Sequence, residues 1–297
     1  MQPSRRAFLL GRRPAQTPWA RFMQRLTLLC QGSVRDLGEA GADGPRGWLA
    51  PAREGDLAHA RALCAEYGVA LALDGVDGTA AAGPCLRVDP ANLSGLARLA
   101  GDVPRWRAQP GVPLAVLAQA GLRQFDGLPG AMTLAEWLAA PAAWPAGRCA
   151  QSGVLAADVV LADGVEETLG PFGESDERPL RSATLQRLVP ALFQLSTGPD
   201  AAAGAAGGAW AGRYRLDALR PQAPATVNLA HLLLGHGGTL AWVQEVLLTA
   251  VPAAEGEGGS DAPSLDDAAR QAGRRLDARI KALFDPDGRF PLLAFSQ

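Results

Sequence analysis

The feature that most constrains the fold of this chain is a strand–helix–strand pattern in residues 47–73, GWLAPAREGDLAHARALCAEYGVALAL. Its middle part has apolar residues at helical spacing, and Gly68 follows where such a helix would stop. The apolar run on each side is typical of a buried strand. Residues 83–89, GPCLRVD, predict a further strand. The chain is therefore expected to mix helices and strands from this point on.

The next stretches continue this mixed pattern. Residues 92–101, NLSGLARLAG, predict a short helix ended by glycine. Residues 105–108 predict a strand, and Pro113 stands at the first turn of the helix that follows. Within residues 158–168, an Asp-Gly pair between two strand-like runs indicates a hairpin.

Two stretches are predicted as linkers. Residues 196–212 are of low complexity, and residues 252–264 are acidic, rich in glycine and without apolar periodicity. After the second linker, Ser264 and Asp267 resemble a capping box that opens a final helix. The apolar stripe of that helix is predicted at Leu265, Ala269, Ala272, Leu276, Ile280 and Leu283.

The first residues imitate an export signal. SRRAFLL, residues 4–10, resembles a twin-arginine signal, but Gly11 and two arginines follow in place of an uncharged segment of about 7 to 15 residues. We therefore expect a basic arm that leads into an amphipathic helix opening at Pro18, and a cytoplasmic location. If the stretch is a working signal, the location is periplasmic. No segment approaches the about 20 apolar residues of a transmembrane span.

Composition excludes several classes of function. The net charge of −2 and the pI near 6.0 argue against a nucleic-acid or membrane-surface role. The four cysteines are scattered, which fits a reducing compartment, and the three histidines lack metal-ligand spacing. We therefore expect no bound metal and no transmembrane segment. With 48% apolar residues in 297, the chain can bury a sizeable core.

Residues 228–248, NLAHLLLGHGGTLAWVQEVLL, place a glycine-rich turn between two apolar runs. Asn228 can cap a short helix that Gly235 ends, and a strand is predicted after Thr239. The loop follows a helix instead of opening one. It is therefore neither a P-loop nor a Rossmann fingerprint, in which the glycines lead into a helix N-terminus.

Taken in order, five stretches resemble the FAD-linked oxidase family, the PCMH-type flavin-binding fold of vanillyl-alcohol oxidase, D-lactate dehydrogenase and the glycolate oxidase FAD subunits. Within this family, the chain resembles the smaller glycolate oxidase FAD-binding subunit. The stretches are WLAPAREGDLAHARALCAEYGVALALDGVDGTAAAGPCLRVDPANLSGLARL, AQPGVPLAVLAQAGL, ADVVLADG, RYRLDALRP with NLAHLLLGHGGTLAWVQEVLL, and DARIKALFDPDGRFP. Each is weak alone, and their shared order makes the resemblance fairly specific.

The resemblance implies a fold of the α+β class with two FAD-binding-type subdomains, an N-terminal amphipathic helix and a C-terminal helix. The implied segments are a basic arm and amphipathic helix at 1–46, a first subdomain at 47–101, a second subdomain at 102–251, a linker at 252–264 where relatives carry a cap domain, and a C-terminal helix and tail at 265–297.

The resemblance also implies a cofactor, FAD held noncovalently. The cofactor-binding residues that it implies are Gly75, Gly78, Thr79, Thr133, Gly235, Gly237, Gly238 and Thr239. Glycines let the backbone pass close to a dinucleotide because they carry no Cβ. The alternative for the loop at 235–239 is a helix stop and a tight turn that contact no ligand.

The two loops that the family uses for the diphosphate depart from its pattern. R-G-G-G-T-S appears here as DGVDGT at 74–79, and T-I-G-G-x-x-A appears as TLAEWLA at 133–139. The changes add bulk at Val76, Ala135 and Trp137, and negative charge at Asp74, Asp77 and Glu136. Two like charges about 4 Å apart repel by about 4 kcal/mol at an effective dielectric near 20, so these carboxylates would have to point away from a diphosphate. The arginines that could compensate are Arg105, Arg107 and Arg148.

Three interpretations follow. In the first, the chain is an FAD-binding oxidoreductase subunit that works in a hetero-complex with a larger FAD-linked oxidase subunit and an iron–sulfur subunit, on substrates such as 2-hydroxy acids. In the second, it is a non-catalytic scaffold of the same fold that no longer binds FAD. In the third, it is a generic α+β domain. No catalytic residue is assigned because the cap domain is missing, and no covalent flavin link is expected.

Overall fold

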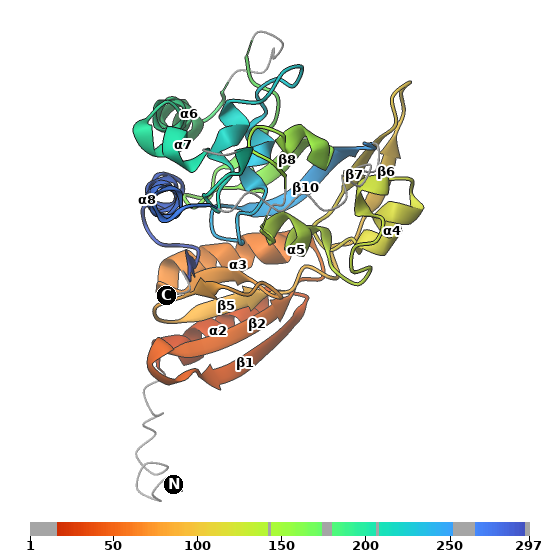
Figure 1. Cartoon of the computed structure of the whole chain (residues 1–297). Helices are drawn as coiled ribbons and strands as arrows, with labels where there is room; N and C mark the ends of the chain where they lie inside the picture. Colours follow the sequence, from red (N-terminus) through yellow and green to blue (C-terminus); the bar gives the residue numbers. More distant parts are fainter. Residues whose placement is uncertain (1–16, 142–143, 174–179, 206–207, 252–264, 295–297) are drawn as a thin grey trace, which may run out of the picture.

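The computed structural model describes residues 17–141, 144–173, 180–205, 208–251 and 265–294. They form a four-stranded sheet in the order β1-β2-β5-β3, a five-stranded sheet in the order β6-β7-β10-β8-β9, and a two-stranded pair, β11-β4. Figure 1 shows the first sheet at the bottom of the molecule and the second sheet above it, with α3 between them. The predicted α+β class is confirmed.

The first sheet carries two helices. Its strands are β1 (Ser33–Glu39), β2 (Pro45–Ala50), β3 (Ala70–Leu73) and β5 (Cys85–Val88). The helices are α2 (Pro18–Leu29) and α3 (Glu54–Tyr67). Strands β2 and β3 run parallel to β5 on its two sides, and α3 connects them. The predicted strand–helix–strand pattern is confirmed, including its stop at Gly68, which adopts the left-handed conformation with φ 65°.

The predicted amphipathic helix is also present. Thr17 caps α2 by accepting a hydrogen bond from the Ala20 amide, and Phe22, Met23 and Leu26 are buried beneath it. Strand β1 lies within the segment that the sequence assigned to the arm, and it pairs antiparallel with β2. The SRRAFLL stretch lies outside the described residues.

The second sheet is antiparallel throughout. Its strands are β6 (Leu96–Leu99), β7 (Arg105–Ala108), β8 (Val154–Val160), β9 (Glu166–Leu169) and β10 (Trp242–Thr249). One face is buried by apolar side chains such as Trp106 and Val246, and the other carries polar side chains such as Arg107 and Glu245. The hairpin predicted around Asp163–Gly164 is confirmed as the β8–β9 connection.

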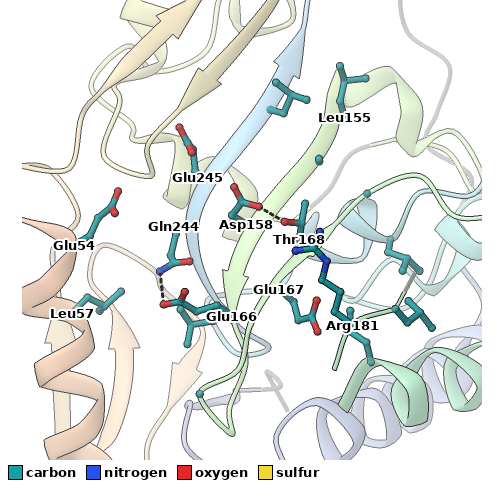
Figure 2. A pocket seen from close by; sticks show the side chains of 18 of the residues that line it. Glu54, Leu57, Leu155, Asp158, Glu166, Glu167, Thr168, Arg181, Gln244 and Glu245 are labelled. Atoms are coloured by element: carbon teal, nitrogen blue, oxygen red, sulfur yellow. Dashed lines mark hydrogen bonds between the residues drawn. The ribbon is translucent and has the colours of Figure 1, made fainter. Parts of the chain in front are cut away.

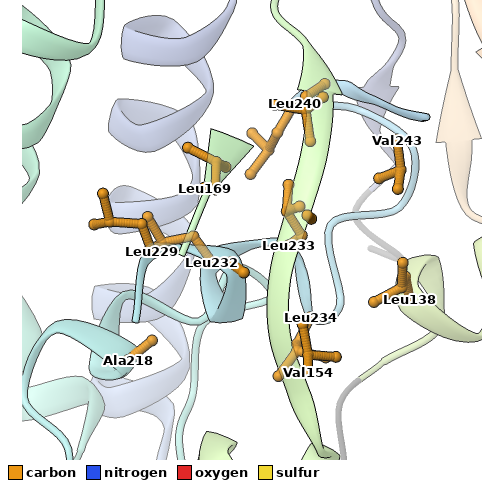
Figure 3. Close-up of a cluster of buried hydrophobic side chains, with 14 of the residues drawn as sticks. Leu138, Val154, Leu169, Ala218, Leu229, Leu232, Leu233, Leu234, Leu240 and Val243 are labelled. Carbon is orange, nitrogen blue, oxygen red and sulfur yellow. The ribbon is translucent and has the colours of Figure 1, made fainter. Parts of the chain in front are cut away.

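Helices and short turns cover the apolar face of the second sheet. They are α4 (Leu114–Gln119), α5 (Leu134–Ala139), α6 (Ala183–Ser196), α7 (Pro199–Gly204), α8 (Asp267–Phe284) and the 3-10 turns η2 (Arg123–Phe125), η3 (Cys149–Ser152), η5 (Leu216–Leu219) and η6 (Leu229–Leu233). The first sheet carries the remaining turn, η1 (Gly41–Asp43). Figure 3 shows part of the core, where leucines of η6 lie beside β8; Leu138 of α5 belongs to the same core.

Two predictions are wrong in this region. Residues 92–101 hold strand β6 instead of a helix, because Leu96–Leu99 pairs in register with β7. Within 196–212, predicted as a linker, α7 forms and buries Ala201. Trp210 in the same stretch packs against the core.

The final helix is confirmed with a different start. Asp266 caps α8 by accepting from the Ala269 amide at 2.6 Å, whereas Ser264 and the linker 252–264 lie outside the described residues. The apolar stripe is buried as predicted at Ala269, Ala272, Leu276 and Ile280; Leu265 is half-buried and Leu283 is 37% exposed. After α8, β11 (Leu292–Leu293) pairs with β4 (Thr79–Ala80) in the separate two-stranded sheet.

Candidate functional site

The structure brings the eight predicted cofactor residues to one place between the two sheets. The 74–79 loop leaves β3 and meets the start of α5, since the free side of Gly75 faces Glu136. The 235–239 loop reaches the end of α5, where the Gly235 amide donates to the Leu138 carbonyl at 2.7 Å. Leu293 links the two loops, because it pairs with Thr79 and lies against Gly237.

A capping box occupies the start of α5. The Thr133 hydroxyl accepts from the Glu136 amide at 3.2 Å, and Oε2 of Glu136 accepts in return from the Thr133 amide at 2.6 Å. The other carboxylate oxygen of Glu136 lies beside Gly75, where an added Cβ would collide with it. The donors of Thr133 are therefore satisfied by the chain itself.

The glycines of the 235–239 loop allow other groups of the chain to approach its backbone closely. The φ angles of Gly237 and Gly238 are 65° and 67°, which favours glycine at both positions. An added Cβ would lie 2.9 Å from Leu293 Cδ2 at Gly237, and 2.9 Å from Leu73 Cβ at Gly238. The loop is buried throughout, and the groups that it approaches are side chains of this protein. Contact of these glycines with a cofactor stays a prediction.

A network of buried polar groups fixes the 235–239 loop. Arg213 donates to the Gly235 carbonyl at 2.6 Å and to the Ala139 carbonyl at 2.7 Å. The Tyr214 hydroxyl and the Thr239 hydroxyl are 2.7 Å apart, and burial raises the pKa of the tyrosine. Lys281 of α8 donates to the Thr239 carbonyl at 2.7 Å. This network could not be predicted from the sequence, because its members lie far apart along the chain.

The buried charges of α8 anchor the loop to the end of the chain. Lys281 contacts Asp285 at 2.5 Å, and both side chains are less than 10% exposed. Asp277 accepts from the amides of Arg213 and Tyr214 at 2.9 and 3.0 Å. Burial raises the pKa of Asp277 to about 6, although these hydrogen bonds and the charge of Arg213 oppose the shift.

Two ring side chains in this region have unsatisfied polar atoms. Among the described residues, the buried nitrogens of the His236 imidazole and of the Trp242 indole have no hydrogen-bond partner. Burial lowers the pKa of His236 to about 3, and the nearby charge of Arg213 adds to the effect. The imidazole is therefore neutral at neutral pH.

The 74–79 loop and the start of α5 fit an FAD diphosphate in part. Gly78 has no atom within 4 Å of its free side, and Asp74 is turned toward Trp48, whose indole nitrogen donates to it at 2.8 Å. The side chain of Glu136 is the obstacle, because it fills the space beside Gly75 with a negative charge. Binding a diphosphate there requires this flexible side chain to rotate away.

The arginines proposed to compensate have other neighbours. Arg107 lies 3.6 Å from Glu245, and Arg148 donates to Gln222 at 3.1 Å. Arg105 lines the open face of the second sheet. The ion pair of Asp74 is instead with Arg87, at 3.6 Å. The expected compensation by Arg105, Arg107 and Arg148 is therefore not seen.

A groove of about 1000 Å³ lies between α3 and the open face of the second sheet, and we call it the sheet groove. Figure 2 shows Glu54 and Leu57 of α3 on one side, with the strands that carry Asp158 and Glu245 beyond them. Burial raises the pKa of Glu245, Arg107 opposes this shift, and the charges of Asp158 and Glu54 add to it. None of the eight predicted residues lines the sheet groove.

The sheet groove was not predicted from the sequence, although the strands contain a signal for it. Arg105 and Arg107 alternate with buried residues in β7, which marks an open polar face. Among the described residues, the walls of the groove carry carboxylates and arginines.

The chain is similar to oxidases of known structure. A solvent-stable cholesterol oxidase is 16% identical with a TM-score of 0.40, over 75% of this chain and 38% of the other. The glucooligosaccharide oxidase from Acremonium strictum, which carries a 6-S-cysteinyl, 8α-N1-histidyl FAD, is 14% identical with a TM-score of 0.43, over 77% and 42%. The 4-ethylphenol oxidase from Gulosibacter chungangensis is 12% identical with a TM-score of 0.45, over 79% and 43%.

This chain thus spans about two fifths of the length of those oxidases. At such identities and TM-scores, the cofactor and reaction of the chain do not follow from the likeness. No protein-family model matches the sequence, and no curated protein matches it.

Other types of site are not seen in the part of the chain that the structure describes. No helix there is long and apolar enough to cross a membrane, and no group of three metal-ligating side chains comes together. All four cysteines are free and buried. Burial raises the pKa of Cys30 to about 11 and that of Cys149 to about 12, so neither is a reactive thiolate at neutral pH.

Proposed function

We propose that this chain is an FAD-binding oxidoreductase subunit that holds FAD noncovalently between its two sheets. The observation that carries the proposal is the meeting of two loops far apart in the sequence, 74–79 and 235–239, at the two ends of one helix, α5. The resemblance to the FAD-linked oxidase family implies, from the sequence alone, that both loops contact the cofactor. Glycines in both loops allow the backbone to lie close to a dinucleotide.

The residues proposed to hold the diphosphate are Gly75, Gly78, Thr79 and Thr133. Gly78 offers open space, and Thr133 offers an amide and a hydroxyl once Glu136 has moved away. FAD, when bound, supplies hydride and electron transfer. In the described part of the chain, no histidine, cysteine or lysine with an exposed reactive group lies at this place. We therefore assign no catalytic residue to the chain.

A subunit without its own reacting groups needs a partner. We propose a larger FAD-linked oxidase subunit and an iron–sulfur subunit as partners, and 2-hydroxy acids as the substrate class. This part of the proposal rests on the resemblance to the glycolate oxidase FAD subunits. Affinity purification of the tagged chain from its native cells tests it: recovery of both subunits in fixed ratio is expected, and recovery of the chain alone would contradict it.

A second candidate function is a scaffold that has lost FAD. The observation that favours it is the way the chain fills its own loops: Glu136 lies beside Gly75, and leucines lie against Gly237 and Gly238. In this case the fold would serve only to hold other subunits.

The absorption spectrum of the purified protein separates the two candidates. A flavin subunit should show a band near 450 nm, and denaturation should release FAD into the supernatant because the link is noncovalent. If the protein is colourless as purified, incubation with excess FAD followed by desalting should restore the band. A colourless protein that retains no FAD after this treatment supports the scaffold.

A further inference from the structure

A second concave site has Arg213 in its wall, the residue that also holds the Gly235 and Ala139 carbonyls. Its volume is about 330 Å³, and we call it the arginine groove. Its walls are the segment 210–213, Pro141 and the first half of α8. The segment packs directly on the helix at Gly273, where an added Cβ would lie 2.5 Å from the Ala211 carbonyl oxygen. This contact holds the two walls together.

Three guanidinium groups line this groove. Arg270 and Arg274 are one turn apart on α8. Arg213 belongs to the other wall, and its Nε and Nη2 donate to the Gly235 and Ala139 carbonyls, which leaves Nη1 for a ligand. Among the described residues, neither Arg213 nor Arg274 forms an ion pair. Arg270 contacts Asp267, which is 99% exposed and is not part of the groove lining. Like charges at this helical spacing repel each other, and a bound anion would relieve the repulsion.

The one carboxylate of the groove, Asp277, offsets only part of the charge of the three arginines among the described residues. Its two oxygens each accept a hydrogen bond from a backbone amide, those of Arg213 and Tyr214. Burial lowers the pKa of Arg213, and the nearby charges of Asp277 and Tyr214 oppose this shift.

The groove also has an apolar wall. Trp210 is half-buried there, and its indole nitrogen is turned inward to donate to the Tyr214 carbonyl at 2.8 Å. Its ring, together with Pro141, offers a surface for the non-polar part of a ligand. A volume near 300 Å³ is at the small end of the range for sites that bind organic molecules.

We propose that the arginine groove binds a small organic phosphate, with the phosphate between Arg213, Arg270 and Arg274 and the organic part against Trp210. Guanidinium forks bind phosphate oxygens through paired, charge-assisted hydrogen bonds. Several guanidinium groups suit a dianion better than a singly charged carboxylate. The groove adjoins the 235–239 loop, because Arg213 also holds the Gly235 carbonyl, but phosphate binding in it does not depend on the FAD proposal.

Isothermal titration calorimetry with phenyl phosphate tests the site. Phenyl phosphate should bind more tightly than inorganic phosphate and than phenol, because it carries both recognised parts. Arg274→Gln should weaken its binding about tenfold, the loss of one charge-assisted hydrogen bond. The matched control is Arg279→Gln, which removes the same charge from the same helix outside the groove and should change the affinity less than twofold.

Three results would overturn this proposal. The first is no heat of binding for phenyl phosphate at millimolar concentration. The second is an equal loss of affinity in the Arg274 and Arg279 variants, which would show attraction by overall charge alone. The third is competition between phenyl phosphate and FAD, which would place the phosphate in the cofactor loops. Both variants change exposed side chains, and their melting temperatures should equal that of the wild type.

Discussion

The carboxylate of Glu136 lies beside Gly75, so the 74–79 loop and the first turn of α5 share one small space. Both residues belong to loops that the sequence assigned to a diphosphate. The carboxylate is bound to Thr133 in a capping box, which stabilises α5 but places a negative charge where the ligand would lie. Under the proposed function, this contact between Glu136 and Gly75 would oppose the binding of FAD.

Glu136→Gln should increase the affinity for FAD. Glutamine can keep the capping box, while the repulsion between the carboxylate and the diphosphate disappears. We expect binding about tenfold tighter, equal to about 1.4 kcal/mol, measured by quenching of FAD fluorescence. Glu39→Gln, a change of the same kind at an exposed position in β1, is the control and should have no effect. Unchanged or weaker binding by Glu136→Gln would show that its carboxylate does not oppose FAD.

Gly75→Ala should destabilise the protein more than Gly78→Ala. Both glycines have positive φ, 76° and 74°, so the backbone strain of the two substitutions is similar, about 1–2 kcal/mol. Only at position 75 does the new methyl group meet Glu136. The difference between the two variants, measured by urea unfolding, should be about 1 kcal/mol and should vanish in a Glu136→Ala background. If Gly75→Ala and Gly78→Ala lose the same unfolding free energy in the wild-type background, Glu136 does not lie beside Gly75.

Much of the fold could be predicted from local sequence, and the errors have a common cause. The apolar spacing of α3 and its stop at Gly68 depend on neighbouring residues, so they can be read directly. Leu96 and Leu99 are also spaced like one face of a helix, but pairing with β7 makes this stretch a strand. That pairing is a tertiary contact, which outweighs weak local preference.

The candidate site could also be predicted only in part from local sequence. The glycines at 237 and 238 indicate that some group lies close to the backbone there, and in the structure such groups are present. Which groups make the contact depends on Leu73 and Leu293, more than 50 residues away on either side. The buried partner of Thr239, Lys281, likewise lies on a helix that the sequence could place but could not orient.

Lys281→Met should cost about 3–5 kcal/mol of unfolding free energy. The substitution leaves the buried carboxylate of Asp285 without its cation, and its desolvation is then uncompensated. Asp285→Asn in the same chain should recover part of this loss, which a double-mutant cycle in urea would reveal. If Lys281→Met alone costs less than about 1 kcal/mol, the pair does not hold the 235–239 loop.

The stability of the protein should fall as the pH is lowered from about 6.5 to about 4. Burial lowers the pKa of His231 to about 4 and that of His236 to about 3, so the unfolded chain, with histidine pKa near 6.5, binds up to two more protons at these groups. The raised pKa of Asp277, about 6, acts in the opposite direction and cancels about one proton. The expected net slope is therefore about 1.4 kcal/mol per pH unit.

Urea unfolding at several pH values tests this slope. His231→Asn removes one of the two histidines, so the remaining histidine and Asp277 should nearly cancel and the slope should approach zero. His59→Asn, at an exposed position of α3, is the matched control. An unchanged slope in the His231 variant would mean that its imidazole is not held neutral in the fold.

The most direct test of FAD binding between the two sheets is a calorimetric titration of the flavin-free protein with FAD, in wild type, Gly78→Asn and Gly78→Asp. Position 78 has open space and a φ of 74°, which asparagine and aspartate both tolerate, so the two variants differ essentially in charge. We predict that the wild type binds, that Gly78→Asn binds within about threefold of it, and that Gly78→Asp binds at least about tenfold more weakly. No binding by the wild type, or equal affinity of the two variants, would contradict the account.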